Sequence, residues 1–572
     1  MYISEIIEIK NYRNLTGKTI KFNDTLNFII GENNIGKTNI LELINIFLSV
    51  GKFIETDFKD IMQPIEIRLK IKYSDEEIGY FEDNFDIDDS RSITLVGIQE
   101  SVDERINYYH DTLNQTKISA SYIRILNVLY YYAQRMPSKE VDFRKTSGSG
   151  KVLNYFIKHS MNQLGIEEEK DIIKKTKLKC IVKDINKNIK SLNTITGDNI
   201  SAYVDTEVNK IVCRLLGLGD DSGRELNSLG EGIQYSFNIL LQIIEIVHNI
   251  KVTRKQEDFE ERLVDKNGKK LFPIFLVLDE PEIHQHPYRQ RSLIKKIVDL
   301  INNKNQEFVE LLKNLFDVDG LIGQIFIATH SPNILLNDYK QFIRIYKNND
   351  FQLKIISGMN ITIENKLYKH MLHNFAYLKE AMFSKCIVFV EGDTENGAIP
   401  VFATRMKLDM DEKGMGVIKL DGADSVKRCM QLYKSFGIKS IAIIDKDKKT
   451  SYASEEGVYF TKGMDYEEDV YNNFKLSDYL KCCKELTGVE HFIPILRSEG
   501  IAFNPAEFIE NPAIVVIDED IQQKIMNERK VRELDKLKSS KNAVKGAILA
   551  KYVTNIPSSF KKVINELKKE VK

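Results

Sequence analysis

One loop in the sequence has the residue types and spacing needed to hold a phosphate group. Residues 31–38 read G-E-N-N-I-G-K-T and match the pattern G-x-x-x-x-G-K-[ST]. In such a loop the glycines let backbone N–H groups wrap a phosphate, the lysine reaches the β- and γ-phosphates, and the hydroxyl binds Mg²⁺. The loop therefore predicts an ATP site with Mg²⁺. Its candidate residues are Gly31, Asn34, Gly36, Lys37, Thr38 and Asn39.

An acidic pair further along the chain supplies the carboxylates that a phosphate-binding loop needs beside it. Asp279 and Glu280 follow the apolar run Leu276–Leu278. Asp279 would hold Mg²⁺, directly or through water, and Glu280 would polarise the attacking water. An Asp-Glu pair after a strand is by itself an ordinary solvated turn, but combined with the loop at 31–38 it predicts the acidic part of the same nucleotide site.

A second set of carboxylates lies in the C-terminal half. Glu391 follows the apolar run Val388–Val390, and Asp445 and Asp447 follow the apolar run 441–444 as D-x-D. The carboxyl ends of parallel strands share one edge of a sheet, so the three side chains could converge there. Hard oxygen ligands without Cys or His indicate Mg²⁺ or Mn²⁺ rather than zinc. Alone, D-x-D is a solvated turn; with Glu391 ahead of it, we expect a metal site.

The elements that must position these residues follow from hydrophobic spacing. The loop at 31–38 lies between an apolar strand, 26–30, and a segment with helical periodicity, 40–50. Ile3, Ile7 and Ile9 are expected on one face of a first strand. The wholly apolar runs 274–278 and 325–328 suit central strands of a parallel sheet. A second set of largely apolar runs follows at 386–390, 417–420 and 440–444. The second set has its own βαβ rhythm, with a helix at 425–436, and marks a new domain near residue 380.

These elements predict an α/β protein with four segments. We expect an ATPase domain formed by 1–150 and 226–378, a helical insertion at 151–225, and an α/β domain at 379–572. Residues 521–572 carry 14 Lys/Arg and 5 Asp/Glu, so the C-terminal segment is basic.

Composition restricts the class of protein. The 572 residues are 42% hydrophobic and 29% charged, which excludes a disordered chain. The net charge of −1 means that nucleic acid would have to bind to local patches. Six scattered cysteines argue against a disulfide framework. Without a long apolar run or a signal-like N-terminus, the expectation is a soluble, cytoplasmic protein without membrane contact.

Two weaker motifs complete an order that is known from one family. Ser228-Leu-Gly230 opens a Gly-rich helix start, and Thr329-His330 follows an apolar strand. With the phosphate loop and the acidic pair, this order resembles the ABC-type ATPases of the SMC and DNA-repair branch. The resemblance implies that Ser228 and Gly230 contact the γ-phosphate of a second subunit, that His330 is a switch histidine and that Arg13 lies near the nucleotide. It therefore implies a homodimer or higher oligomer. The glutamine loop stays open between Gln63 and Gln99.

The C-terminal carboxylates resemble the TOPRIM domain of topoisomerases, primases and certain nucleases. An ABC-type ATPase joined to a TOPRIM domain is similar to the OLD (overcoming lysogenisation defect) nucleases, which include the nuclease subunit of the Gabija anti-phage system and retron-associated relatives. The family pattern implies two metal ions, with Glu395 and Glu467 helping to hold the second. It also implies a basic residue near the scissile phosphate, for which Lys541 and Lys545 are the candidates.

The resemblance implies a nucleotide-regulated DNA endonuclease of an anti-phage system, with a helicase or a retron reverse transcriptase and its RNA–DNA element as partners. The alternative is an ATP-sensing assembly or switch subunit whose TOPRIM domain acts only within a complex. A topoisomerase is disfavoured because the phosphate loop is of the wrong ATPase type and no tyrosine has a catalytic signature. A primase is disfavoured because its zinc module is absent.

Overall fold

The computed structural model describes the chain except residues 79, 114, 134–136, 144, 146, 165–174, 198, 205–215, 363–378, 421, 423, 453–454 and 571–572. The chain divides into two units, Met1–Asn360 and Ile361–Lys572. The domain boundary expected at 378/379 follows directly on residues 363–378, which lie outside the described part.

The first unit contains two large sheets. An antiparallel sheet has the order β2-β1-β4-β5-β6-β7, and a mainly parallel sheet has the order β11-β12-β13-β3-β14-β15, with β8 pairing β12. The strands of the first sheet are β1 Tyr2–Lys10, β2 Ile20–Lys21, β4 Ile65–Lys72, β5 Ser92–Gln99, β6 Asn107–His110 and β7 Lys117–Ile118. Those of the second are β3 Leu26–Gly31, β8 Val128–Tyr131, β11 Val264–Lys266, β12 Lys269–Asp279, β13 Gly320–Thr329, β14 Phe342–Lys347 and β15 Leu353–Ser357.

Helix α1, Lys37–Leu48, supplies the core between these sheets. Its Ile40, Ile44 and Phe47 are fully buried and belong to one apolar cluster with Leu69 of β4 and Phe326 of β13. The apolar spacing predicted from 40–50 therefore marks the buried face of this helix. Because α1 follows β3 directly, its burial fixes the loop between them.

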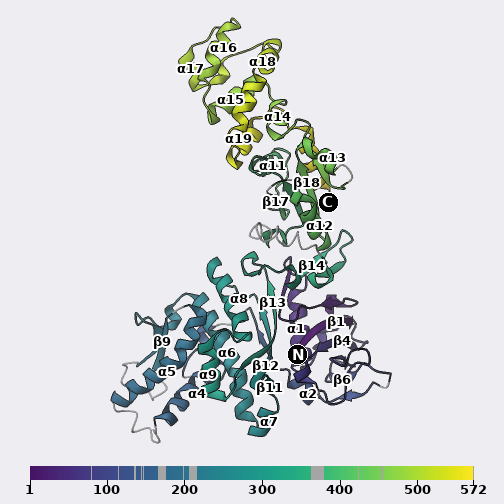
Figure 1. Cartoon of the computed structure of the whole chain (residues 1–572), viewed down its shortest axis with the longest axis vertical. Helices are drawn as coiled ribbons and strands as arrows, with labels where there is room; N and C mark the ends of the chain where they lie inside the picture. The colour runs from purple at the N-terminus through teal and green to yellow at the C-terminus, as the bar shows by residue number, and fades with distance from the viewer. Residues whose placement is uncertain are drawn as a thin grey trace. The chain divides into compact units, whose positions relative to one another are not determined.

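Most of the remaining helices of the first unit lie on the other side of the parallel sheet, whereas Ile123 of α2 is buried in the same cluster as α1. Figure 1 shows α4, α5, α6 and α9 to one side of β12, and β1, β4 and β6 to the other. The helices are α2 Ala120–Arg124, α3 Pro137–Glu140, α4 Ser149–Gln163, α5 Lys175–Thr196, α6 Glu231–Thr253, α7 Gln256–Glu260, α8 Pro287–Ile301 and α9 Gln306–Phe316.

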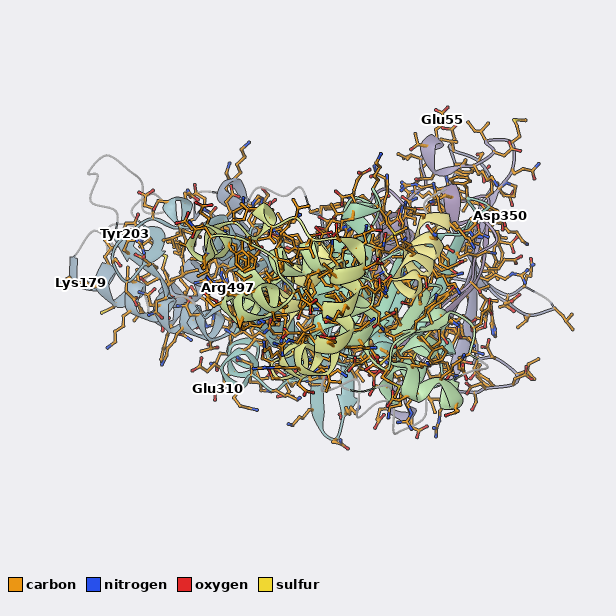
Figure 2. All side chains as sticks on the ribbon, turned by 90° about the horizontal axis from the view of Figure 1, so that it is seen from above. Glu55, Lys179, Tyr203, Glu310, Asp350 and Arg497 are labelled. Carbon is orange, nitrogen blue, oxygen red and sulfur yellow. The ribbon has the colours of Figure 1, made fainter. Side chains whose placement is uncertain are left out.

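The segment expected as a helical insertion also contains a β-hairpin. After α4 and α5, strands β9, Ile200–Val204, and β10, Leu216–Asp220, pair antiparallel. Asn186 of α5 joins the hairpin to the helix, since its side chain donates to Ala202 O at 3.0 Å and accepts from Ala202 N at 2.6 Å. In Figure 2, Lys179 of α5 and Tyr203 of β9 lie at the same end of the molecule.

Strand β1 corrects the expected spacing of its isoleucines. The buried residues are Ile3, Ile6 and Ile9, whereas Ile7 is only partly buried. The pairing of β1 with β4 shifts register between Ile3 and Glu5 and again between Ile6 and Glu8. Each bulge moves the inward face by one residue, so a strict period of two does not hold.

The second unit is built on a parallel sheet with the order β17-β16-β18-β19. Its strands are β16 Cys386–Val390, β17 Met415–Lys419, β18 Lys439–Ile444 and β19 Val458–Phe460. The predicted apolar runs at 386–390, 417–420 and 440–444 therefore fall on neighbouring strands. Val388 and Ile441, opposite each other in the register, are both buried.

Helices surround this sheet and form a second layer beyond it. They are α11 Asp393–Arg405, α12 Asp424–Ser435, α13 Lys449–Tyr452, α14 Tyr466–Tyr471, α15 Leu476–Leu486, α16 Ile493–Ser498, α17 Pro505–Glu510, α18 Glu519–Lys538, α19 Ala543–Tyr552 and α20 Ser558–Lys569. Within this unit Figure 1 shows α15–α18 gathered at one end and β17, β18 and α12 at the other. Across the described residues of both units, no helix combines the length and apolarity needed to cross a bilayer.

Candidate functional site

The loop between β3 and α1 has the backbone conformation of a phosphate-binding loop. Gly31 has φ +154° and Gly36 has φ +111°, in regions that residues with a Cβ avoid. A Cβ on Gly31 would lie 2.2 Å from the carbonyl oxygen of Ile345, and one on Gly36 would meet the side chain of Asn14 at 2.7 Å. Asn34, between them, also has a positive φ of 56°. The glycines are therefore required by the tight path of the chain.

Lys37 and Thr38 lie where the predicted chemistry needs them. Lys37 Nζ donates to Gly31 O at 3.0 Å and to Glu32 O at 2.7 Å, and burial lowers its pKa to about 8. Thr38 Oγ1 lies 3.3 Å from Asp279 Oδ2, so the hydroxyl and the carboxylate face each other across the sheet edge. Burial and the neighbouring charge of Glu280 raise the pKa of Asp279 to about 6, which a bound cation would reverse.

Glu280, expected to polarise water, is paired with His330, the expected switch histidine. His330 Nε2 lies 3.2 Å from Glu280 Oε1, and this hydrogen bond lowers the pKa of the Glu280 carboxyl group. The two residues meet because β12 and β13 are adjacent parallel strands, with Asp279 opposite Ala328. A water-polarising carboxylate and its histidine partner therefore lie at one edge of the sheet.

Sequence reasoning missed the role of Glu282, which holds this edge together. Its carboxylate is 7% exposed, and Oε1 accepts from the hydroxyl of Thr329 and from His330 N at 3.2 Å. Pro281 and Glu282 follow the acidic pair directly, and nothing in the order of residues shows that Glu282 turns back toward the next strand.

Arg13 comes before the phosphate loop in the chain, and its side chain contacts the first turns of α1. Its guanidinium donates to Asp57 Oδ1 and to Asn39 Oδ1, both at 2.7 Å, and it also pairs with Glu42. Asn39 in turn donates to Asn14 Oδ1 at 2.8 Å.

Gln99 is fully buried, and its amide is engaged with the backbone of Phe53. Gln63 is exposed, which leaves it as the more accessible of the two glutamine-loop candidates.

Ser228 and Gly230 are exposed at the N-terminal end of α6. Ser228 Oγ donates to Glu225 O at 2.7 Å, and a Cβ on Gly230 would meet open space. The next turn of α6 is packed tightly, since a Cβ on Gly232 would lie 2.8 Å from His284 O. In the described residues no hydrogen bond joins this surface to the loop at 31–38.

The second candidate site lies at the carboxyl edge of the parallel sheet in the second unit. β16 and β18 are neighbours, with Val390 opposite Ile443. Glu391 Oε2 accepts a hydrogen bond of 3.0 Å from Asp445 N. The two residues that end these strands are therefore brought together as the sequence predicted.

Burial and mutual repulsion dominate the electrostatics of this site. Burial, followed by the charges of Glu395 and Glu391, raises the pKa of Asp445 to about 8. Burial and the charge of Glu467 raise the pKa of Glu395 to about 7. Asp445 Oδ1 and Glu467 Oε1 are buried and accept no hydrogen bond from the described residues. Carboxylates in this condition fit a divalent cation, which would supply the missing positive charge.

Lys541 reaches this cluster, whereas Lys545 does not. Lys541 Nζ lies 2.8 Å from Glu467 Oε2 and 3.9 Å from Asp465 Oδ2. Lys545 is 5% exposed and donates to Lys536 O at 3.0 Å and to Ser540 Oγ at 3.3 Å. Of the two candidate lysines, only Lys541 faces the carboxylates.

Close packing of α11 on α19 explains how Lys541 reaches Glu395 and Glu467. A Cβ on Gly397 would lie 1.9 Å from Ala543 O, and one on Gly546 would lie 1.9 Å from Thr394 O. The two backbones therefore touch where α19 begins. In the sequence Gly397 and Gly546 are 149 residues apart, and no pattern around them predicts that their helices pack together.

Asp447 is not brought into the cluster. It is exposed, and its ion pair is with the neighbouring Lys448 at 3.7 Å. In the described part of the chain, no three His, Cys, Asp or Glu side chains are close enough together to hold a metal ion. The turn is nevertheless fixed, because Lys446 N donates to Thr461 Oγ1 at 3.1 Å and Thr461 Oγ1 donates to Gly463 O at 2.9 Å. Thr461 was not among the predicted site residues, and it has no motif around it.

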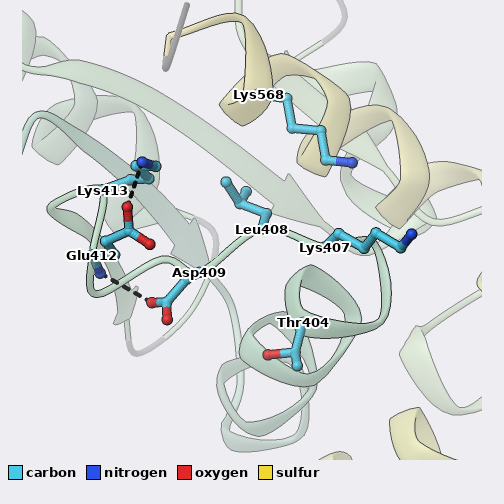
Figure 3. Close-up of a pocket in the computed structure, with 7 residues that line it drawn as sticks. All are labelled: Thr404, Lys407, Leu408, Asp409, Glu412, Lys413 and Lys568. Carbon is cyan, nitrogen blue, oxygen red and sulfur yellow. Dashed lines mark hydrogen bonds and ion pairs between the residues drawn. The ribbon is translucent and has the colours of Figure 1, made fainter.

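A separate hollow of about 570 Å³ lies elsewhere in the second unit. Figure 3 shows its lining, with Glu412 paired to Lys413 and Asp409 bonded to the backbone of Glu412. The residues that line it are Thr404, Lys407, Leu408, Asp409, Glu412, Lys413 and Lys568. None of these is a candidate catalytic residue, so the hollow is distinct from the carboxylate cluster.

The fold and these sites define a P-loop ATPase joined to a TOPRIM domain. The family model described as "AAA ATPase domain" matches residues 1–149 and 144–335, and the model described as "Overcoming lysogenization defect protein-like, TOPRIM domain" matches 382–447. The chain belongs to the AAA ATPase domain family and carries an OLD-like TOPRIM domain. The predicted fold class and the resemblance to the OLD family are confirmed.

Curated relatives match only part of the chain. The DNA replication and repair protein RecF of Bacillus cereus (strain G9842) is 31% identical over 165 residues, which are 29% of this chain and 38% of that protein. RecF of Bacillus thuringiensis (strain Al Hakam) is 30% identical over the same length. The chain thus spans well under half the length of these relatives.

Solved structures give weaker similarities. The SmcHead bound to the C-winged helix domain of ScpA has a TM-score of 0.36 at 15% identity, covering 62% of this chain and 98% of that one. The C-terminal region of the Burkholderia pseudomallei OLD protein has a TM-score of 0.23 at 15% identity, covering 33% of this chain and 100% of that one. Both scores are below 0.5, so the family assignment depends on the family models.

Proposed function

We propose that this protein is a nucleotide-regulated, divalent-metal-dependent DNA endonuclease that acts in the cytoplasm as part of an anti-phage defence system. The observation that carries the proposal is the carboxylate cluster of Glu391, Glu395, Asp445 and Glu467 beside Lys541 in an OLD-like TOPRIM domain, in which Glu395 and Glu467 are buried. The same chain has a complete phosphate-binding loop. DNA as substrate is supported by the RecF relatives, which are named for DNA replication and repair.

The cluster would hold Mg²⁺ or Mn²⁺ through Glu391 and Asp445, with Glu395 and Glu467 as ligands of a second ion. Bound cations would lower the barrier by activating a water and by neutralising the leaving oxygen. Lys541 is the candidate for stabilising negative charge on the phosphate that reacts. The basic segment after residue 521 would contribute to holding the DNA backbone.

ATP would act through a homodimer or higher oligomer. Lys37, Thr38 and Asp279 would bind the phosphates and Mg²⁺, and Glu280 with His330 would position water for hydrolysis. The exposed Ser228 and Gly230 would complete the nucleotide site of a second copy, because they have no described hydrogen bond to their own phosphate loop.

Cleavage of supercoiled plasmid DNA with Mg²⁺ or Mn²⁺ tests the proposal. The double variant Asp445→Ala with Asp447→Ala is expected to abolish nicking, because it removes the Asp445 carboxylate of the proposed site together with the second carboxylate of the D-x-D motif. Asp411→Ala, which removes an exposed carboxylate of the same unit, should retain the activity of the unchanged protein. Full nicking by the double variant would exclude this site.

The position of Asp447 favours a second candidate function. Since its carboxylate is exposed and apart from Glu391, the TOPRIM domain could become active only within a partner complex. The chain would then be an ATP-sensing switch that works with a helicase or with a retron reverse transcriptase and its RNA–DNA element. Purified protein that cleaves DNA only after such a partner is added would support this candidate.

A further inference from the structure

The ammonium group of Lys541 lies inside the carboxylate cluster. Its Nζ is 2.8 Å from Glu467 Oε2 and 3.9 Å from Asp465 Oδ2. The Glu467 side chain is fully buried, and its other oxygen accepts no hydrogen bond from the described residues. Lys541 is therefore the cation that this buried carboxylate faces.

The carboxylates of the cluster differ in their ion pairs. Glu391 and Asp445 are joined through the backbone N–H of Asp445, and no ion pair with a lysine or arginine is found for either among the described residues. Glu467 is paired with Lys541, and Glu395 beside it in the cluster is 4% exposed. Within the described residues Lys541 is thus the cation that makes a direct ion pair in this cluster.

Moving the Lys541 side chain out of the cluster costs free energy. Its ammonium group would have to give up the ion pair with the fully buried Glu467 carboxylate and move away from Asp465. The turn that carries it is held by the backbone contact between α11 and α19 and by Asn542, whose side chain accepts from Lys545 N at 2.8 Å. A second divalent ion would have to displace an ammonium that is positioned by the fold.

We propose that Lys541 occupies the place of a second cation at Glu395 and Glu467, so that the protein binds one divalent ion strongly and a second only when Lys541 moves away. This inference rests on the proposed function, because it concerns the ions of the same site. Binding of the second ion then determines the metal concentration at which both ion positions are filled. The released ammonium is then free to contact a phosphate group.

Binding of Mn²⁺ to the full chain without DNA, measured by titration calorimetry, tests the inference. The unchanged protein should show one strong site in the second unit. Lys541→Met, which removes the charge and keeps the length of the side chain, should make a second site appear or tighten it about tenfold or more. The sites of the ATPase unit are identified by repeating the titration in Lys541→Met combined with Asp279→Asn.

Two matched variants make the result specific. Lys530→Met removes a lysine that pairs with Glu468 of the same acidic turn at 2.7 Å, and it should leave Mn²⁺ binding unchanged. Lys541→Arg keeps the charge, so it should bind Mn²⁺ like the unchanged protein even if Lys541→Met loses stability.

Two equally strong sites in the unchanged second unit, or identical isotherms for the unchanged protein and Lys541→Met, would overturn the inference and leave the proposed nuclease intact. No Mn²⁺ binding by the second unit in any variant would overturn both.

Discussion

The hydroxyl of Tyr466 donates a hydrogen bond of 3.0 Å to the carbonyl oxygen of Gly546. Tyr466 is fully buried and begins α14, the helix that carries Glu467, while Gly546 lies on the first turns of α19, just after Lys541. The bond therefore fixes the acidic and the basic parts of the carboxylate cluster relative to each other. Since Gly546 also touches α11, three helices meet at one backbone position.

Gly546→Ala is expected to destabilise the second unit by about 1–3 kcal/mol, because its Cβ would lie 1.9 Å from the carbonyl oxygen of Thr394. The atoms that this Cβ would meet are backbone atoms of α11, which cannot shift alone, so α11 and α19 would have to move apart. Urea unfolding measures the change. Gly416→Ala of the same unit is the control, since its Cβ would meet only a hydroxyl group at 3.3 Å. Equal stability of the two variants would contradict this account of the helix crossing.

The local elements of both units could be predicted from apolar spacing because each strand or helix is stabilised by its own buried face. The run 274–278 is such a case: all of its side chains are buried in β12. The phosphate loop, the acidic pair and Glu391 with Asp445 could also be predicted, since each follows a strand directly. The bulges of β1 could not, because a bulge depends on the pairing with β4 rather than on the order of residues in β1.

Contacts between distant segments account for the rest. Glu282 faces Thr329, and Thr461 fixes the backbone at Lys446, through turns whose direction depends on the packed sheet. The exposure of Asp447 has the same origin. Directly after β18, Asp445 has an extended backbone and stands at the N-cap position of a short 3-10 turn, Lys446–Lys448. Asp447 lies within that turn. The sequence shows D-x-D but not where the second carboxylate points.

ATP with Mg²⁺ is expected to raise the melting temperature of the protein, and Lys37→Met should remove most of that rise. Lys37 is 5% exposed and lies inside the loop, so its charge can be used only by a group bound there. A ligand at 100 times its dissociation constant stabilises the folded state by about 2.7 kcal/mol. Lys52→Met, at an exposed lysine beyond the end of α1, should keep the full effect in the same thermal-shift assay. An undiminished shift in Lys37→Met would place the nucleotide elsewhere.

Acidification below about pH 6.5 should destabilise the first unit through His248. Its imidazole packs at a tilt against Tyr155 and edge-on to Phe316, and burial, aided by the charge of Lys151, lowers its pKa below 6.5. The unfolded chain then takes up the proton first, so stability is full above pH 6.5 and is lost as the pH falls toward the folded pKa. The further lysine that faces this ring is Lys158. His248→Phe should flatten the dependence of unfolding free energy on pH between 7 and 5, and an unchanged slope would exclude His248 as its source.

Glu282→Ala is expected to reduce the turnover of ATP about tenfold to a hundredfold, with little change in nucleotide affinity. The Glu282 carboxylate accepts from the hydroxyl of Thr329 and from the backbone of His330, so it holds His330 against Glu280 without itself facing the phosphate loop. Loss of that support leaves the ATP-binding residues in place and misplaces the pair that orients water. Glu282→Gln keeps an oxygen that can accept the same hydrogen bonds, and it should restore much of the rate. Steady-state ATPase kinetics separate the two quantities, since a purely structural defect would raise KM and lower kcat together and would not be rescued by glutamine.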